Sequence, residues 1–232
     1  MEFLYGIHPV KIALEERKRI IKQLLVYQSK NLDLTEILKL AEHSRVPIQY
    51  STKYELNRIT NNSAHQNVVL ECKEIEAQSY KNEFEKEPWI IGLERVMDPH
   101  NLGSIIRSCG FYSVPVILDE GCGRLSPVVS KASAGVLEHY WAKGRLGKIS
   151  SFTKHSFSHP LIASICHKEE STVVHSLPTR GILLIGNEGD GLKKKTFESA
   201  QYRYHLPGHI NSLNAAVAAG ILMDRILNNK IT

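Results

Sequence analysis

The chain has 232 residues, of which 29 are basic and 24 acidic, so its net charge is +5 with neutral histidines. Apolar residues make up 42% and charged residues 23%, a composition that excludes disordered and collagen-like chains. The four cysteines are too far apart for a zinc ribbon or a thioredoxin-type motif and favour a reducing compartment, and no apolar run approaches the ~18 residues of a membrane span.

Residues 1–78 alternate helix and strand signals, which is typical of a small α/β layer domain. Pro9 stands near the start of one amphipathic stretch, where proline is favoured in helices. Apolar residues at helical spacing predict further helices, and short apolar runs predict strands. We therefore expect helices at 9–16, 34–41 and 53–59 and strands at 23–27, 46–50 and 68–70.

The segment 79–88 is polar and contains a proline at its end, so we predict a linker there. Counting charges on either side sharpens this division. Residues 1–78 hold 11 basic and 10 acidic residues, the segment 79–88 holds two and three, and residues 89–232 hold 16 and 11. The basic excess therefore lies in the second part, where it permits an acidic partner such as RNA without requiring one.

Residues 89–232 are predicted to form a second α/β domain. Strands are expected at 89–93, 114–118, 161–165 and 181–186, and helices at 102–109, 128–137 and 212–227. Strands that alternate with helices indicate a mostly parallel sheet covered on both faces.

The first of three polar clusters follows the strand at 89–93. Asp98 and Asn101 can each cap a helix, and Arg107 follows about two turns later. Taken alone, this cluster is more often a capped helix with a surface arginine than a site.

The second cluster, 186–192, reads Gly-Asn-Glu-Gly-Asp-Gly-Leu after a buried strand. Its glycines allow the backbone to approach a ligand closely, but their order fits neither the dinucleotide fingerprint nor the phosphate-binding P-loop. The third cluster, 206–214, ends with Ser212 or Asn214 as the cap of a helix rich in small residues. Taken alone, each of these two clusters is more often a structural feature than a functional site.

Other candidate sites are weaker. His155 and His159 have i,i+4 spacing, but no third ligand accompanies them, so we predict no metal site. The run 193–195 is three lysines, which is usually a solvated charge run, although it directly follows the second cluster and lysines there suit phosphate contacts.

Taken together and in this order, the three clusters resemble the motifs of the SpoU family of RNA ribose 2′-O-methyltransferases, in the SPOUT superfamily. Residues 98–107 resemble its first motif, 186–192 its second, and 212–214 with the following helix its third. Ser126–Gly135 also resembles a segment of the family. Two segments of the first domain, Tyr5–Val10 and His65–Gln66, resemble bacterial and mitochondrial members that methylate a guanosine ribose in the peptidyl-transferase loop of large-subunit rRNA.

The resemblance implies an architecture that composition does not. The second domain would be a SPOUT α/β-knot, a mostly parallel sheet with a deep trefoil knot, although chains otherwise avoid threading. The first domain, 1–78, would be a small ribosomal-protein-like RNA-binding module. S-adenosylmethionine would bind in a bent shape between the knotted loops. The chain would form a homodimer with the small-residue helix near the interface, and it would need no metal and no membrane.

The resemblance also assigns roles to residues. It implies that the 2′-hydroxyl is activated by Arg107, although a guanidinium pKa above ~12 makes stabilisation of the alkoxide or positioning of a phosphate an alternative. The implied catalytic set is Arg107, Asn101, Glu188, Ser212 and Asn214. The implied cofactor-binding set is Gly186, Asn187, Glu188, Gly189, Leu206, Pro207, Leu213 and Asn214.

Two departures from the family pattern affect these expectations. Asn67 replaces the glycine of a His-Gln-Gly segment, so we expect a different turn there. The stretch 207–214 is about two residues shorter than in common bacterial relatives, which changes details of the cofactor pocket. The amino-acid sequence of 126–135 and the presence of Asn187 favour the mitochondrial branch of the family, and hence a location in the mitochondrial matrix. The lack of a transit peptide instead favours a bacterial, cytoplasmic protein.

Three alternatives stay open at this point. The same reaction on tRNA is the nearest, and the first domain favours rRNA only by analogy. A non-catalytic RNA-binding or ribosome-assembly factor of the same fold is the second, disfavoured because all five residues of the implied catalytic set are present. A nucleotide-binding enzyme that acts on small molecules is the most distant.

Overall fold

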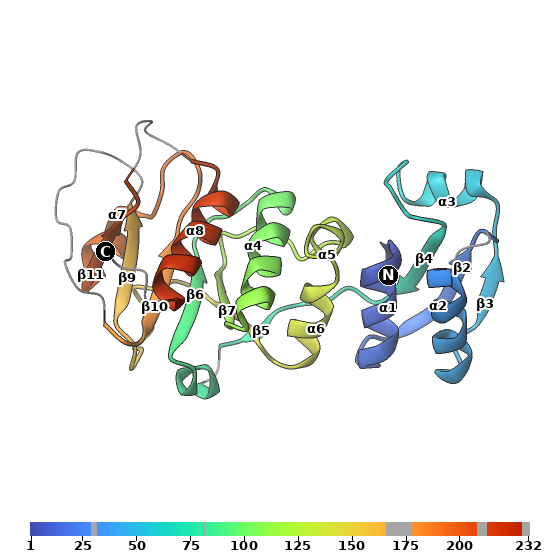
Figure 1. Ribbon diagram of the computed structural model, residues 1–232, viewed down its shortest axis with the longest axis horizontal. Coiled ribbons are helices and arrows are strands. Elements are labelled where there is room, and N and C mark those ends of the chain that lie inside the picture. The colour runs from blue at the N-terminus through green and yellow to red at the C-terminus, as the bar shows by residue number, and fades with distance from the viewer. Residues whose placement is uncertain (29–31, 81, 166–177, 208–212, 229–232) are drawn as a thin grey trace. The chain divides into compact units, whose positions relative to one another are not determined.

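The computed structural model describes residues 1–28, 32–80, 82–165, 178–207 and 213–228. Its internal contacts divide the chain into two compact units. The first unit contains residues 1–76 and 125–143, and the second contains 77–124 and 144–232. The elements of both are labelled in Figure 1.

The first unit is built on a four-stranded sheet. Its strands are β1 (Glu2–Tyr5), β2 (Ile21–Val26), β3 (Ile48–Tyr50) and β4 (Val68–Cys72), in the order β1-β4-β2-β3. Strand β4 is antiparallel to both of its neighbours, and β2 and β3 are parallel. All five residues of β4 are buried, as expected for a central strand.

Helices cover both faces of this sheet. The apolar sides of α1 (Ile7–Glu16) and α2 (Leu32–His43) form one core with Leu24 and Leu70 of the sheet. On the other face, α3 (Lys53–Ile59) places Leu56 against Leu25 and Val69. A capping box starts α3, because the Thr52 side chain accepts from Glu55 N and the Glu55 carboxylate accepts from Thr52 N.

Two more helices complete the first unit. Helix α5 (Pro127–Ala132) packs against β1 and α1, and α6 (Val136–Ala142) packs against α1. The single helix expected over 128–137 is therefore wrong. It is broken because Ala134 and Gly135 take positive φ angles of 53° and 85°, which an α-helix cannot contain.

The segment 79–88, predicted as a polar linker, carries structure of its own. It overlaps strand β5 (Gln78–Ser79) and contains the 3-10 helix η1 (Asn82–Lys86). Tyr80 and Phe84 are buried in the core of the second unit, with their ring centroids 5.4 Å apart. Two aromatic side chains spaced four residues apart are enough to pack an otherwise polar stretch onto a core.

The second unit contains a seven-stranded sheet that is parallel throughout. Its order is β11-β9-β10-β6-β7-β8-β5. The bounds are β6 (Trp89–Leu93), β7 (Val116–Asp119), β8 (Leu146–Ile149), β9 (Leu161–Ile165), β10 (Gly181–Ile185) and β11 (Tyr202–His205). Strands β6 and β10 are central neighbours and are buried along their whole length, which confirms the predicted mostly parallel sheet.

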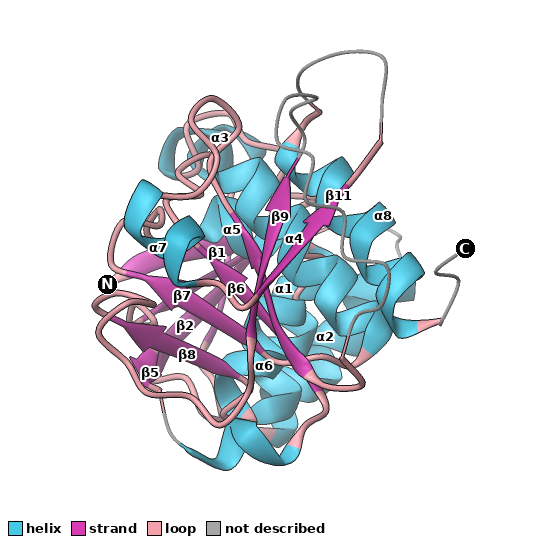
Figure 2. Ribbon diagram, turned by 90° about the vertical axis from the view of Figure 1, so that its left-hand side faces the viewer, coloured by secondary structure: helices cyan, strands magenta, loops and turns pink. Residues whose placement is uncertain are grey.

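Helices α4 (Pro99–Tyr112) and α8 (Ala215–Leu227) pack together on one face of this sheet. Cys109 and Met223 meet between them, with their sulfur atoms 3.9 Å apart. Helix α7 (Lys194–Ser199) lies on the opposite face, as Figure 2 shows. None of the helices in the described part of the chain is long and apolar enough to cross a bilayer.

The implied trefoil knot involves the stretch between β11 and α8. Residues 208–212 of that stretch lie outside the described residues, as does Ser212 of the implied catalytic set. The knot therefore stays a prediction.

Candidate active site

Three loops meet at the carboxyl ends of the central strands. Residues 94–98 follow β6, residues 186–193 follow β10, and residues 213–214 lead into α8. Because β6 and β10 are adjacent and parallel, their loops leave the sheet at the same edge. That edge is where open α/β sheets bind their ligands.

The side chain of Asn101 connects the three motifs identified in the sequence. Helix α4 begins with Asp98 as its cap, whose Oδ1 accepts from Asn101 N at 2.8 Å, and with Pro99 in its first turn. This places Asn101 in that turn, where Nδ2 donates to the carboxylate of Glu188. Its Oδ1 accepts from Asn214 Nδ2 at 2.9 Å. Asn101 thus contacts both Glu188 and Asn214, the latter 113 residues away in the chain.

Asn214 makes this contact while capping a helix. Its Oδ1 accepts from the backbone N–H groups of Ala216 and Val217 at 3.0 and 3.2 Å. Of the two cap candidates in the sequence, Asn214 is therefore the cap that is observed. Its amide nitrogen stays available for Asn101, so the start of α8 is tied to the start of α4.

Residues 186–191, which we call the glycine loop, fold back on themselves. Asn187 N donates to Gly191 O at 3.1 Å, and Gly191 N donates to Asn187 O at 3.0 Å. A Cβ atom on Gly186 would lie 2.2 Å from the carbonyl carbon of Gly191, so only glycine fits. The Asn187 side chain accepts from Gly189 N at 2.8 Å and donates to Arg95 O at 3.2 Å.

Charged side chains hold the glycine loop against the sheet. Arg95 Nη2 donates to Gly191 O at 3.2 Å, and Arg95 N donates to the buried Asp119 carboxylate at 2.9 Å. Lys193 Nζ donates to the same carboxylate at 2.7 Å, a hydrogen bond that raises the pKa of Lys193. Asp119 therefore ties the loop after β7 to the loops after β6 and β10.

Glu94 holds the residues that follow the glycine loop. This fully buried carboxylate accepts from Lys193 N and from Thr196 Oγ1, both at 2.6 Å. We did not single out Glu94, Arg95 or Asp119 from the sequence. The available signal was their position, because each directly follows or ends a buried apolar strand, where a charged residue needs a partner.

Arg107 does not join this cluster. It lies ~9 Å along α4 from Asn101, on the exposed side of the helix. It forms no hydrogen bond or ion pair with any residue that the structure describes. The Arg107 side chain is thus free to contact a substrate.

Of the remaining predicted residues, Leu206 is buried, Leu213 is half-buried and Pro207 is exposed.

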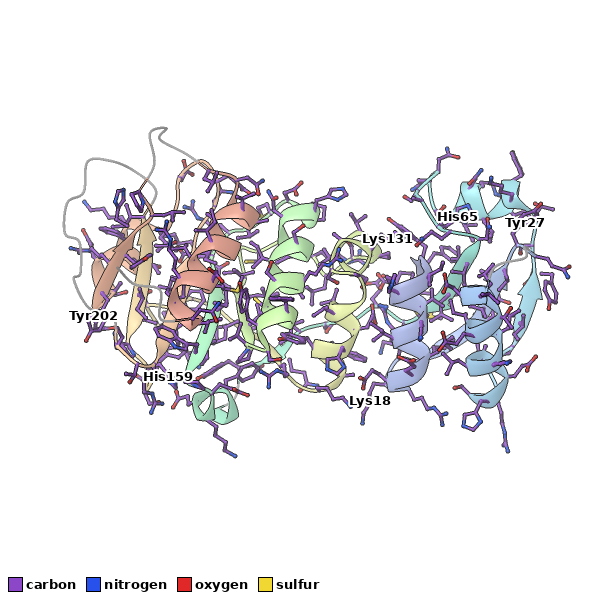
Figure 3. All side chains as sticks on the ribbon, in the orientation of Figure 1. Lys18, Tyr27, His65, Lys131, His159 and Tyr202 are labelled. Carbon is purple, nitrogen blue, oxygen red and sulfur yellow. The ribbon has the colours of Figure 1, made fainter. Side chains whose placement is uncertain are left out.

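The two histidines at i,i+4 spacing have other roles. His159, labelled in Figure 3, is buried, and its Nε2 lies 2.8 Å from Glu87 O. His155 packs edge-on against Tyr80 with ring centroids 5.3 Å apart. Within the described part of the chain, no group of three His, Cys, Asp or Glu side chains is arranged to hold a metal ion.

Comparisons with known proteins match two family models to this chain. The model of the SpoU rRNA Methylase family matches residues 88–224, and a model described as RNA 2′-O ribose methyltransferase substrate binding matches residues 3–78. Human "rRNA methyltransferase 1, mitochondrial" is 27% identical over 269 residues, which cover 99% of this chain and 73% of the human protein.

A bacterial relative is equally similar over its full length. The 23S rRNA (guanosine-2′-O-)-methyltransferase RlmB of Neisseria meningitidis is 26% identical over 244 residues, which cover 98% of this chain and 97% of that protein. Among solved structures, the AdoMet-bound rRNA methyltransferase from Sinorhizobium meliloti has a TM-score of 0.75 at 21% identity, covering 100% of this chain and 88% of that one. This last likeness shows a shared fold.

Proposed function

Because the chain belongs to the SpoU rRNA methylase family, we propose that it methylates the ribose 2′-hydroxyl of a guanosine in large-subunit rRNA, with S-adenosylmethionine as methyl donor. The observation that carries the proposal is the Asn101 side chain, which joins the family's three motifs through Glu188 and Asn214. The names of the human and Neisseria relatives support the substrate.

The loops at the carboxyl edge of β10 fit such a cofactor. At Gly186 the glycine loop packs against its own backbone with no room for a side chain. Main-chain amides and carbonyls suit an adenine edge and hydroxyl groups, and the Glu188 carboxylate suits a positive charge. The residues that we propose to hold the cofactor are the predicted set, Gly186, Asn187, Glu188, Gly189, Leu206, Pro207, Leu213 and Asn214. When bound, S-adenosylmethionine supplies a methyl group on a positively charged sulfur.

The protein's own residues would then act on the ribose. A 2′-hydroxyl is a weak nucleophile and must lose its proton as it attacks. Arg107, exposed and without a protein partner, is the group we assign to the developing alkoxide. A guanidinium donates up to five hydrogen bonds and does not readily accept a proton, so stabilisation of negative charge fits it better than the role of general base.

The exposed apolar side chains of α4 and α8 support a homodimer. Phe111 on α4 and Val217 and Ile221 on α8 expose 83%, 51% and 37% of their areas. Large exposed apolar side chains on two helices that pack together are typical of an interface. A second copy covering these helices would double the solution molar mass from 26.2 kDa, which light scattering measures.

The assigned role of Arg107 predicts a split between binding and turnover. Arg107→Ala should lower methyl transfer at least ~1000-fold, since it removes charge stabilisation from the reacting oxygen. Binding of S-adenosylmethionine should stay within about twofold. Transfer is measured with tritiated methyl donor on in vitro transcribed rRNA, and cofactor affinity by calorimetry. Lys154→Ala, which removes another exposed positive charge, is the control. Unchanged turnover in Arg107→Ala would remove the assignment.

Mapping of ribose methylation in total RNA, with and without the gene, tests the substrate. Loss of one guanosine mark in large-subunit rRNA is the expected result. Loss of a tRNA mark would replace the proposed substrate by tRNA, and no change in any RNA would favour a binding factor without catalysis. Relatives from bacteria and from mitochondria both match, which supports a site of action in either the cytoplasm or the matrix.

A further inference from the structure

Three sequence segments that resemble the family have no place in the proposed chemistry: Tyr5–Val10, His65–Gln66 and Ser126–Gly135. The structure brings them together in the first unit. Gln66 Oε1 accepts from Ile7 N at 3.2 Å and also from the ammonium group of Lys131. Figure 3 labels Lys131 and His65, the residue before Gln66.

Two glycines, Gly6 and Gly135, allow the three segments to pack closely. A Cβ on Gly6, whose φ is 95°, would lie 2.8 Å from Lys131 Cδ. A Cβ on Gly135, whose φ is 85°, would lie 2.7 Å from Ile12 Cδ1 and 3.0 Å from the carbonyl oxygen of His8. The three segments therefore form one tightly packed contact.

A buried ionic network lies in the same contact. Arg19, whose side chain is 2% exposed, donates from Nη1 to Glu138 Oε1 at 3.0 Å and from Nη2 to Glu2. Ser130 Oγ donates to the same Glu138 oxygen at 2.6 Å. The Arg19 guanidinium is thus held by carboxylates from the amino-terminal strand and from helix α6.

An exposed set of ionic contacts borders the buried one. Glu16 accepts from His139 Nδ1 at 2.6 Å and pairs with Lys143 Nζ at 3.0 Å. Although partial burial opposes it, hydrogen bonds from Lys143 and His139 hold the pKa of Glu16 below its usual range. Trp141 Nε1 donates to Glu76 O at 3.1 Å. We call all these contacts between residues 1–76 and helices α5 and α6 the docking interface.

The two sides of the docking interface belong to different family models. Residues 3–78 match the substrate-binding model, whereas α5 and α6 fall inside the stretch matched by the methylase model. A flexible tether alone would not need a buried arginine, two positive-φ glycines and matched side chains from both stretches. Burying Arg19 is favourable only with its carboxylate partners in place, so the interface specifies one arrangement of these elements.

Resting on the proposed function, we infer that the docking interface couples RNA capture to methyl transfer, with Arg19, Glu138 and Lys131 as positioning residues. RNA held by residues 3–78 reaches the reaction as an intramolecular partner, because its carrier packs on α5 and α6, and the chain joins these helices on both sides to the rest of the methylase stretch. Without the interface, RNA and cofactor still bind, but bound RNA seldom reaches the reacting position.

Two full-length variants test this inference. Arg19→Met breaks the buried network, and the double variant Glu16→Gln/Lys131→Met breaks contacts at the border without placing a charge in the core. In Arg19→Met, the single-turnover rate of methyl transfer to in vitro transcribed large-subunit rRNA should fall at least ~10-fold. In the double variant it should fall about threefold. Affinities for RNA and for S-adenosylmethionine should stay within about twofold in both.

The control and the readouts separate coupling from folding. Lys18→Met removes an exposed positive charge next to Arg19 and should change nothing. Hydrogen exchange of α1 and α6 amides should quicken in both variants while the amides of β6 and β10 keep their protection. Unchanged single-turnover rates in both variants, or an equal fall in both binding affinities, would overturn the inference. A wild-type protein that methylates no RNA would instead overturn the proposed function, and the exchange result would still report on the interface.

Discussion

The glycine loop of the second unit and the loop at 61–67 of the first unit both have irregular backbone, but they use different residues to form it. The glycine loop has glycine where a Cβ would lie 2.2 Å from main chain. The loop at 61–67 contains no glycine, yet Asn61, Asn62, Gln66 and Asn67 all have φ between 51° and 65°. Close approach of two backbone segments requires glycine, whereas a left-handed dihedral angle alone is met here by three asparagines and one glutamine.

The loops also differ in the charge of their supports. Arg95 donates to Gly191 of the glycine loop. Lys193, which follows the loop, bonds the carboxylates of Glu94 and Asp119. In the loop at 61–67, a neutral ring does this work. His65 Nε2 lies 2.8 Å from Asn57 Oδ1, and its Nδ1 accepts from Asn67 N at 3.0 Å. The backbone of the glycine loop is thus contacted by a charged side chain, whereas the backbone of the loop at 61–67 is held by a neutral ring of its own, and Lys131 contacts only the Gln66 side chain.

The largest effect of a substitution is expected at Gly186, where the glycine loop packs most closely against its own backbone. Gly186→Ala should weaken binding of S-adenosylmethionine about 100-fold, equivalent to about 2.8 kcal/mol, because the methyl group forces the glycine loop open. Calorimetry measures this affinity. Gly220→Ala on α8 is the control, since its Cβ would meet no atom within 4 Å and Gly220 lies outside the predicted cofactor-binding set. Equal losses in the two variants would contradict the distinction between the two loops.

A smaller effect is expected where only a dihedral angle is demanded. Asn67 has φ of 65°, so Asn67→Ala should lower the free energy of unfolding by about 1 kcal/mol. Asn67→Gly should change it by only a few tenths of a kcal/mol, because glycine adopts this angle without strain. Urea denaturation measures both. An alanine variant as stable as the glycine variant would show that the angle is not the constraint.

The smallest effect concerns the neutral support. Burial, with a further contribution from Lys53, lowers the pKa of His65, so the folded state binds its proton less tightly than the unfolded state. Stability should therefore fall as pH drops below ~6.5, by about 1 kcal/mol or less. NMR titration of the His65 ring against a His8 control, whose side chain is exposed, checks the sign. A pKa above ~6.5 for His65 would be the contrary result.

The elements of the fold that can be predicted from the sequence are those in which several consecutive residues are apolar and buried. Strands β6 and β10 are buried at all five positions and stand out as apolar runs. Strand β11 was missed because all four of its residues are half-buried and polar or aromatic. The break between α5 and α6 was missed because it depends on dihedral angles at Ala134 and Gly135.

The candidate site divides in the same way. Asn101, Glu188 and Asn214 were predicted because three polar clusters, each at the end of a recognisable element, resemble the SpoU motifs in the same order. The supports of the glycine loop were missed because their partners are far apart in the chain: Lys193 is 74 residues from Asp119 and 99 from Glu94. The turn at Asn67, expected to differ from the family's glycine turn, has a left-handed angle that glycine also adopts. The catalytic role of Arg107 stays a prediction.

The pairing of β6 with β10 has a consequence for biosynthesis. Strand β6 ends at residue 93 and its neighbour begins at residue 181. While the ribosome adds the residues between them, the nascent chain exposes an apolar strand edge that has no partner on that side. Parallel pairings over such distances form slowly. The centre of the sheet, which carries the glycine loop, is therefore completed late in translation, and chains that stall before residue 181 have an open edge prone to aggregation.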